Sequence, residues 1–178
     1  MSREDIEQHY YGQWGESELT KEFTSPDVNL VMHRWAQSAR TGGVAIYATC
    51  GVSDRRDGEG NGVEVLAGIA PACDEILEPM ANVAASIVEA GNVATHGGTW
   101  DMGGPLWSGT ELGFFLTLHQ HPALPPLVNS AGKVEFYTAI PIFEYEAKLA
   151  KSAGLSALKA SWKSAKVSFW NPNRGPST

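Results

Sequence analysis

The sequence of 178 residues contains only two cysteines, Cys50 and Cys73, and each lies in or beside an apolar segment. A disulfide framework is therefore excluded, and two buried free thiols are expected rather than a single disulfide, as in a reducing compartment. There is no run of about 18 apolar residues, which argues against a membrane-spanning helix. The N-terminus is polar and acidic and lacks the pattern of a secretory signal, so a cytoplasmic location is expected.

Positive charge is missing from a long central part of the chain. No lysine or arginine occurs between Asp57 and Gly132, whereas nine acidic residues give this stretch a charge of -9. From Glu146 to the end, the balance is +5. Nucleic acid is not expected to bind the acidic stretch, because phosphate neutralisation needs clustered lysine and arginine. The stretch is either a solvated acidic face or a docking surface for a cationic partner.

Motifs of cofactor and catalytic chemistry are also missing. The chain has no phosphate-binding loop, dinucleotide fingerprint or Gly-x-Ser-x-Gly elbow. His119 and His121 alternate as two metal ligands on a strand would, but zinc needs three or four ligands and no third is recognisable by spacing. We therefore expect no enzyme, no cofactor, no metal and no small-molecule substrate, while metal binding by the two histidines stays open.

The order of the predicted elements favours an α+β fold, since strands and helices do not alternate strictly. The patterns predict strands over 28–35, 43–50, 62–70, 110–118 and 133–142, and helices over 2–11, 74–90, 143–153 and 155–164. One domain over 27–166 is expected, with a helical N-terminal extension over 1–26. The remaining segment, 167–178, is expected to be a tail that frays beyond Pro172.

The helix over 74–90 carries the clearest periodicity. Apolar residues recur at a spacing of three to four, and Asp74 and Glu75 lie in the first turn, where they suit the helix dipole. Pro79 interrupts the pattern, so the regular helix is expected to begin near Leu77. Gly91 ends it.

Three segments together resemble the suppressor of fused (SUFU) domain family. They are Ile46–Asp54 with its Gly-Val-Ser-Asp turn and the following strand Val63–Ile69; His96–Trp100 with Ser108–Leu112; and Val134–Ile142 running into Glu144–Lys148. The resemblance covers about 27–164. The chain departs from the family's pattern over Asp101–Leu106, where many bacterial relatives carry a Gly-His pair.

The resemblance implies a central mixed sheet flanked by helices and no catalytic residues. Animal members restrain a transcription factor by binding an extended peptide, whereas many bacterial members look like immunity proteins that neutralise polymorphic toxins by direct binding. The bacterial interpretation is favoured because the chain is short. The alternative is a regulatory scaffold that sequesters a partner protein by strand addition or in a cleft.

A basic toxin domain is the partner that the acidic stretch would attract. The candidate contacts are acidic residues and loop tryptophans, of which the acidic loop 54–61 is the first choice. They are Asp54, Asp57, Glu59, Trp100, Asp101 and Trp107. A role in capping the core is favoured for the two tryptophans, and anchoring a partner is the alternative, since tryptophan is enriched among interface hot spots.

Overall fold

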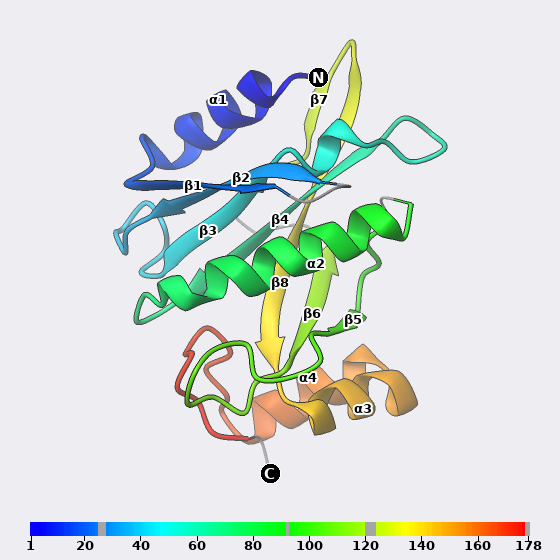
Figure 1. Ribbon diagram of the computed structural model, residues 1–178. Helices are drawn as coiled ribbons and strands as arrows, with labels where there is room; N and C mark the ends of the chain where they lie inside the picture. The colour runs from blue at the N-terminus through cyan, green and yellow to red at the C-terminus, as the bar shows by residue number, and fades with distance from the viewer. Residues whose placement is uncertain (25–27, 92, 120–123, 177–178) are drawn as a thin grey trace.

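The computed structural model describes residues 1–24, 28–91, 93–119 and 124–176. A single sheet has the strand order β1-β2-β3-β4-β8-β6-β5, and β7 pairs with β8 (Figure 1). The strands are β1 (Leu19–Thr24), β2 (Asn29–Trp35), β3 (Ala45–Cys50), β4 (Gly62–Ile69), β5 (Gly98–Asp101), β6 (Phe114–His119), β7 (Leu127–Asn129) and β8 (Gly132–Ile142). The helices are α1 (Arg3–Trp14), α2 (Leu77–Glu89), α3 (Glu144–Ala153) and α4 (Leu155–Ser164), with short 3-10 turns η1 (Val52–Asp54) and η2 (Asp74–Ile76).

The long strand β8 joins the two halves of the sheet. It runs parallel to β4, with Gly62 opposite Val134, and antiparallel to β6, with Phe114 opposite Ile142. The other strand pairs are antiparallel. The sheet is therefore mixed and flanked by helices, which confirms the predicted α+β class.

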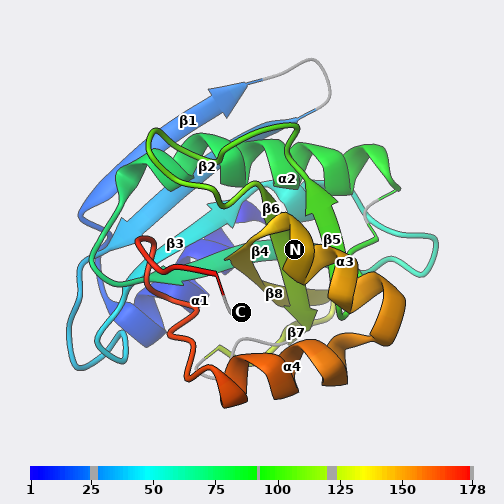
Figure 2. The same ribbon diagram turned by 90° about the horizontal axis from the view of Figure 1, so that it is seen from below.

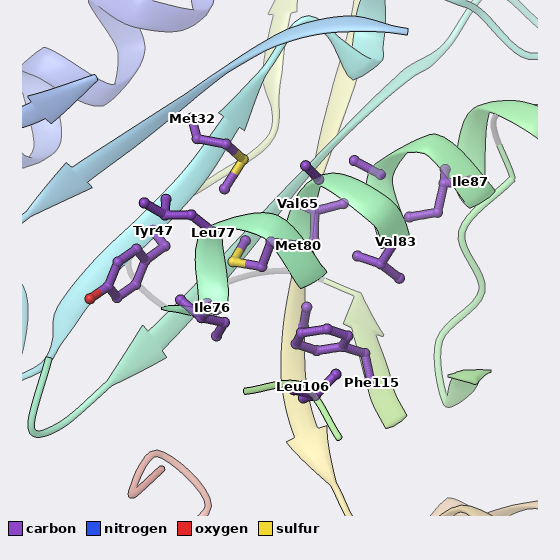
Figure 3. Packing of buried hydrophobic residues seen from close by; sticks show 14 of the residues in the cluster. Met32, Tyr47, Val65, Ile76, Leu77, Met80, Val83, Ile87, Leu106 and Phe115 are labelled. Carbon is purple, nitrogen blue, oxygen red and sulfur yellow. The ribbon is translucent and has the colours of Figure 1, made fainter. Parts of the chain in front are cut away.

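Helix α2 covers one face of the sheet (Figure 1). Its apolar stripe packs on alternate residues of the strands, and Figure 3 shows Met80 and Val83 against Met32 and Val65. These side chains are fully buried. Burial of each contributes about 1.5–3 kcal/mol to stability, so this layer is the main core.

The opposite face is covered by two separate helical units. Helix α1 packs Tyr10 and Trp14 against Trp35 and Phe136. Helices α3 and α4 form an antiparallel pair, and Trp162 of α4 belongs to the cluster that they bury on β6 and β8. Figure 2 shows α1 and α4 as separate elements.

The structure confirms most predicted elements and adds three strands. The regular helix begins at Leu77, as expected from Pro79. The short strands β1, β5 and β7 lie in segments predicted to be irregular, and β6 begins at Phe114 because 110–113 form a loop. Both cysteines are free thiols, although only Cys50 is fully buried. No helix in the described part of the chain has the length and apolarity needed to span a membrane.

The tail is anchored at Arg174, beyond Pro172, which corrects for residues 173–176 the expectation that it frays. Arg174 reaches into the molecule and forms an ion pair of 2.5 Å with Glu146. Both side chains are at most 4% exposed. An arginine near a chain end gives no periodic signal, so sequence patterns could not reveal this contact.

Candidate protein-binding surface

The Gly-Val-Ser-Asp turn after β3 is held by a buried carboxylate. Glu64 of β4 is fully buried and accepts hydrogen bonds from the backbone N–H groups of Gly51 and Ser53, at 2.9 and 3.1 Å. The hydroxyls of Ser53 and Thr49 donate to it as well, at 2.7 and 2.5 Å. Burial raises the pKa of Glu64, and these hydrogen bonds act against that rise. The carboxylate therefore fixes the chain direction into the loop 54–61.

The loop 54–61 carries three of the candidate contacts, but cations lie beside it. Asp54 forms a 2.7 Å ion pair with Arg3 of α1. Asp57 accepts the N–H groups of Glu59 and Asn61 at 2.9 and 2.8 Å, and these bonds lower its pKa. Glu59 is exposed. Because Asp54 is already paired, the loop offers a cationic partner less free charge than its sequence indicates.

The other three candidates lie on and beyond β5. Trp100 is half-buried, and its indole N–H donates to the Thr117 hydroxyl at 3.4 Å. Asp101 is exposed and accepts the N–H of Gly103 at 2.9 Å. Trp107 is only 9% exposed and belongs to the main core. It therefore supports the surface from below more than it projects from it.

The register of β8 separates these two groups of candidates. The loop 54–61 leads into Gly62, which lies opposite Val134 of β8. Asp101 pairs with Phe114, which lies opposite Ile142. The eight residue steps of β8 from Val134 to Ile142 span about 26 Å. The six candidate contact residues therefore do not form one site.

A pair of surface hollows lies beside the loop 102–111, near the start of α2. Two hollows of about 640 and 350 Å³ lie there, and both are lined by Glu75 and Trp107. Glu111 also lines the larger hollow, and Glu78 lines the smaller one. We refer to this pair as the acidic hollows.

Four acidic residues line the acidic hollows, and one of them is neutralised. Asp74 accepts two hydrogen bonds from Arg34, at 2.8 and 3.0 Å, and one from the Tyr47 hydroxyl at 2.9 Å. Its role is to tie η2 to β2 and β3. Glu75, Glu78 and Glu111 are exposed and form no ion pair within the described residues. Arg174 also lines the larger hollow, but its charge is used by Glu146.

Sequence reasoning missed Glu75 and Glu78 as contact residues, because Glu75 was explained by the helix dipole and Glu78 was counted only in the charge of the acidic stretch. Their spacing of three places them on one face of the helix predicted over 74–90, which was the available signal. The depth of the hollows depends on how the loop 102–111 folds against α2, and that fold has no sequence pattern.

Two groups of residues have metal-ligand chemistry. The His119 ring Nε2 lies 2.9 Å from a carboxylate oxygen of Glu135, and His121 lies outside the described residues. In the described ranges, Glu7, His33 and Cys50 place one ligand atom each within 4.8 Å of one another. Burial raises the pKa of the Cys50 thiol, so a metal ion there would first have to displace its proton.

Comparisons with known proteins agree with the overall fold. The family model described as suppressor of fused protein (SUFU) matches residues 26–175. The crystal structure of a SUFU homologue from Neisseria gonorrhoeae superposes with a TM-score of 0.74 at 16% identity, covering 99% of this chain and 96% of that chain. No curated protein sequence matches.

Two further structures are similar as well. The crystal structure of the Sufu-Fu complex contains a chain with a TM-score of 0.73 and 14% identity, covering 98% of this chain and 90% of that one. The crystal structure of Suppressor of Fused from Drosophila superposes with a TM-score of 0.68 at 14% identity. The match covers 98% of this chain and 50% of that chain. At these identities the likeness is one of fold.

Proposed function

Because the chain belongs to the suppressor of fused family, we propose that it is a non-catalytic immunity protein that neutralises a cationic toxin by direct binding. The observation that carries this proposal is the pair of acidic hollows, whose free carboxylates at Glu75, Glu78 and Glu111 face solvent. The relative in the Sufu-Fu complex supports protein binding as the general mode, since it was crystallised with a protein partner.

The chemistry of the acidic hollows suits a lysine or arginine side chain of the partner that projects from a flat apolar part of its surface. The carboxylates supply charge, while Met102, Pro105 and Trp107 supply apolar walls beside them. A partner side chain that enters such a hollow loses its water of hydration. The ion pair formed there then contributes more to the binding free energy than an ion pair at the exposed rim. Binding would cover the toxin's active site sterically and needs no catalytic group of this chain.

The loop 54–61 and the edge strand β5 are secondary contacts in this proposal. Asp57, Glu59 and Asp101 add negative charge at the two ends of the sheet, and such charge steers a cationic partner as it approaches. We expect reversal of these charges to slow association more than it changes dissociation.

A regulatory scaffold that holds an extended peptide is the second candidate function. Strand addition is disfavoured at β1, an edge strand that carries the exposed charges of Lys21 and Glu22. Salt separates the two candidates, because binding to a cationic toxin weakens with ionic strength and strand addition does not.

The test is co-expression with the protein encoded beside this gene, with growth as the readout. The proposal predicts that the neighbour arrests growth and that this chain restores it through a one-to-one complex whose affinity falls with salt. A neighbour that is not toxic, or that this chain binds without restoring growth, would contradict the immunity function.

A further inference from the structure

An apolar groove lies on the sheet face opposite α2, beside the end of α4. It has a volume of about 580 Å³. Leu118 of β6 and Ile140 of β8 line it, together with Trp162 of α4 and the segment 166–170. We call it the lysine groove, for the three lysines described below.

The lysine groove carries two exposed aromatic residues in sequence, Phe169 at 36% and Trp170 at 42% exposure. They are not loose, because Phe169 stacks on Trp162 with ring centroids 5.5 Å apart and meets Trp170 edge-on at 5.0 Å. Exposed aromatic rings that are held in place are typical of surfaces that bind a partner.

The backbone around these rings is fixed as well. The carbonyl of Trp170 accepts the N–H of Ala70 at 2.8 Å, and the N–H of Val167 donates to the carbonyl of Trp162 at 2.9 Å. The buried pair of Arg174 and Glu146 anchors the chain just beyond. A partner therefore meets a groove that is already formed, which lowers the entropy cost of binding.

The rim of the groove is positive in a protein whose net charge is -7. Lys159, Lys163 and Lys166 line it, all three are exposed, and none forms an ion pair within the described residues. The first two lie one turn apart on α4. This charge is opposite to that of the acidic hollows, so the groove suits a different kind of ligand.

We propose that the lysine groove binds an acidic, extended segment of a partner protein that carries large apolar side chains. The apolar side chains lie on Leu118, Ile140 and the rings of Phe169 and Trp170, while the carboxylates face Lys159 and Lys163. Charge complementarity selects this occupant, because a basic segment would be repelled by the rim. The inference goes beyond the proposed toxin binding and does not depend on it.

The experiment measures fluorescence anisotropy of a labelled acidic peptide, Asp-Asp-Phe-Glu-Asp-Phe-Asp-Glu, with the purified chain. Two further peptides serve as controls, one with alanine for phenylalanine and one with lysine for each acidic residue. Saturable binding of the first peptide alone is expected. Lys159→Glu with Lys163→Glu should weaken it about tenfold, and Trp170→Ala about thirtyfold, as for an interface hot spot.

The matched control is Lys21→Glu with Lys151→Glu, which makes the same change in net charge on exposed lysines outside the groove. Its affinity for the acidic peptide should stay within about twofold of the wild type, as for rim charges.

Equal weakening by both pairs of substitutions, equal binding of the alanine peptide, or no binding of the acidic peptide would overturn the proposal. So would a dimer of the free chain that Trp170→Ala abolishes, because the occupant would then be a second copy. The peptide assay uses no toxin, so its failure leaves the immunity proposal standing.

Discussion

Glu64 and Glu146 are both fully buried, and each holds a segment that leads to a candidate binding surface. Glu64 fixes the turn before the loop 54–61 through four neutral donors and forms no ion pair within the described residues. Glu146 fixes the tail beside the lysine groove through Arg174, and the indole of Trp162 donates to it at 2.7 Å. The two sites therefore stabilise a buried carboxylate by different means.

The pKa directions reflect this difference. At Glu64, burial dominates and raises the pKa. At Glu146, burial also raises the pKa, but the hydrogen bonds and charge of Arg174 outweigh it, and the net pKa is lowered. A carboxylate without a cation is therefore tolerant of losing its charge, whereas a paired one is not.

The largest effect is expected from Arg174→Met, which leaves the buried charge of Glu146 without its partner. We expect a loss of about 3–5 kcal/mol in the free energy of unfolding, measured by chemical denaturation. Arg40→Met, at an exposed arginine, is the control and should change stability by less than about 0.5 kcal/mol. A similar small loss for both variants would show that the tail is not anchored by this pair.

A smaller effect separates the two glutamates when each is replaced by glutamine. Both carboxylate oxygens of Glu146 accept from N–H groups of Phe143, Trp162 and Arg174, which cannot accept in return, so an amide NH₂ would meet one of these donors and Glu146→Gln should cost about 3 kcal/mol. Around Glu64, the Thr49 hydroxyl donates to one oxygen and also lies 3.4 Å from the carbonyl of Val65. It can turn to that carbonyl and accept from the amide, so Glu64→Gln should cost less than about 1 kcal/mol. Equal costs would contradict the comparison.

The smallest effect is the pH dependence of these two variants. Glu64 has a raised pKa when folded, so its contribution to stability is lost as pH rises through that value. Glu146 has a lowered pKa when folded, so its contribution is lost as pH falls through that value. The pH range in which Glu64 changes stability therefore lies above the ordinary glutamate pKa of about 4.3, and the range for Glu146 lies below it.

Denaturation across this range should therefore show two opposite trends. Relative to the wild type, Glu64→Gln gains stability as pH rises, and Glu146→Gln recovers stability as pH falls. Parallel trends for the two variants would mean that neither local environment controls the charge of its carboxylate.

The sequence predicts the regular core because periodic burial leaves a pattern. Strands β3 and β8 and helix α2 follow from their apolar spacing. Strand β1 was missed because it is an edge strand whose residues are mostly exposed, so its sequence carries little apolar alternation. Strand β5 was missed because its glycine and its four-residue length resemble a loop.

The candidate surface was predicted less well for a physical reason. Charge along the sequence identified the acidic stretch, but ion pairs such as Arg3 with Asp54 and Arg34 with Asp74 join residues that are far apart in the chain. Only the fold shows which carboxylates are already neutralised and which, like Glu75 and Glu78, stay free.

The most direct test of the immunity proposal is calorimetric titration of the neighbouring gene product with the double variant Glu75→Lys and Glu78→Lys. The matched control is Glu16→Lys with Glu22→Lys, an equal change in charge at exposed positions outside the acidic hollows. We predict that the first pair weakens binding by about a hundredfold, as for partly desolvated charges, and that the control weakens it by less than about threefold. Equal losses would show that net charge alone attracts the partner, and no loss in either would contradict binding at the acidic hollows.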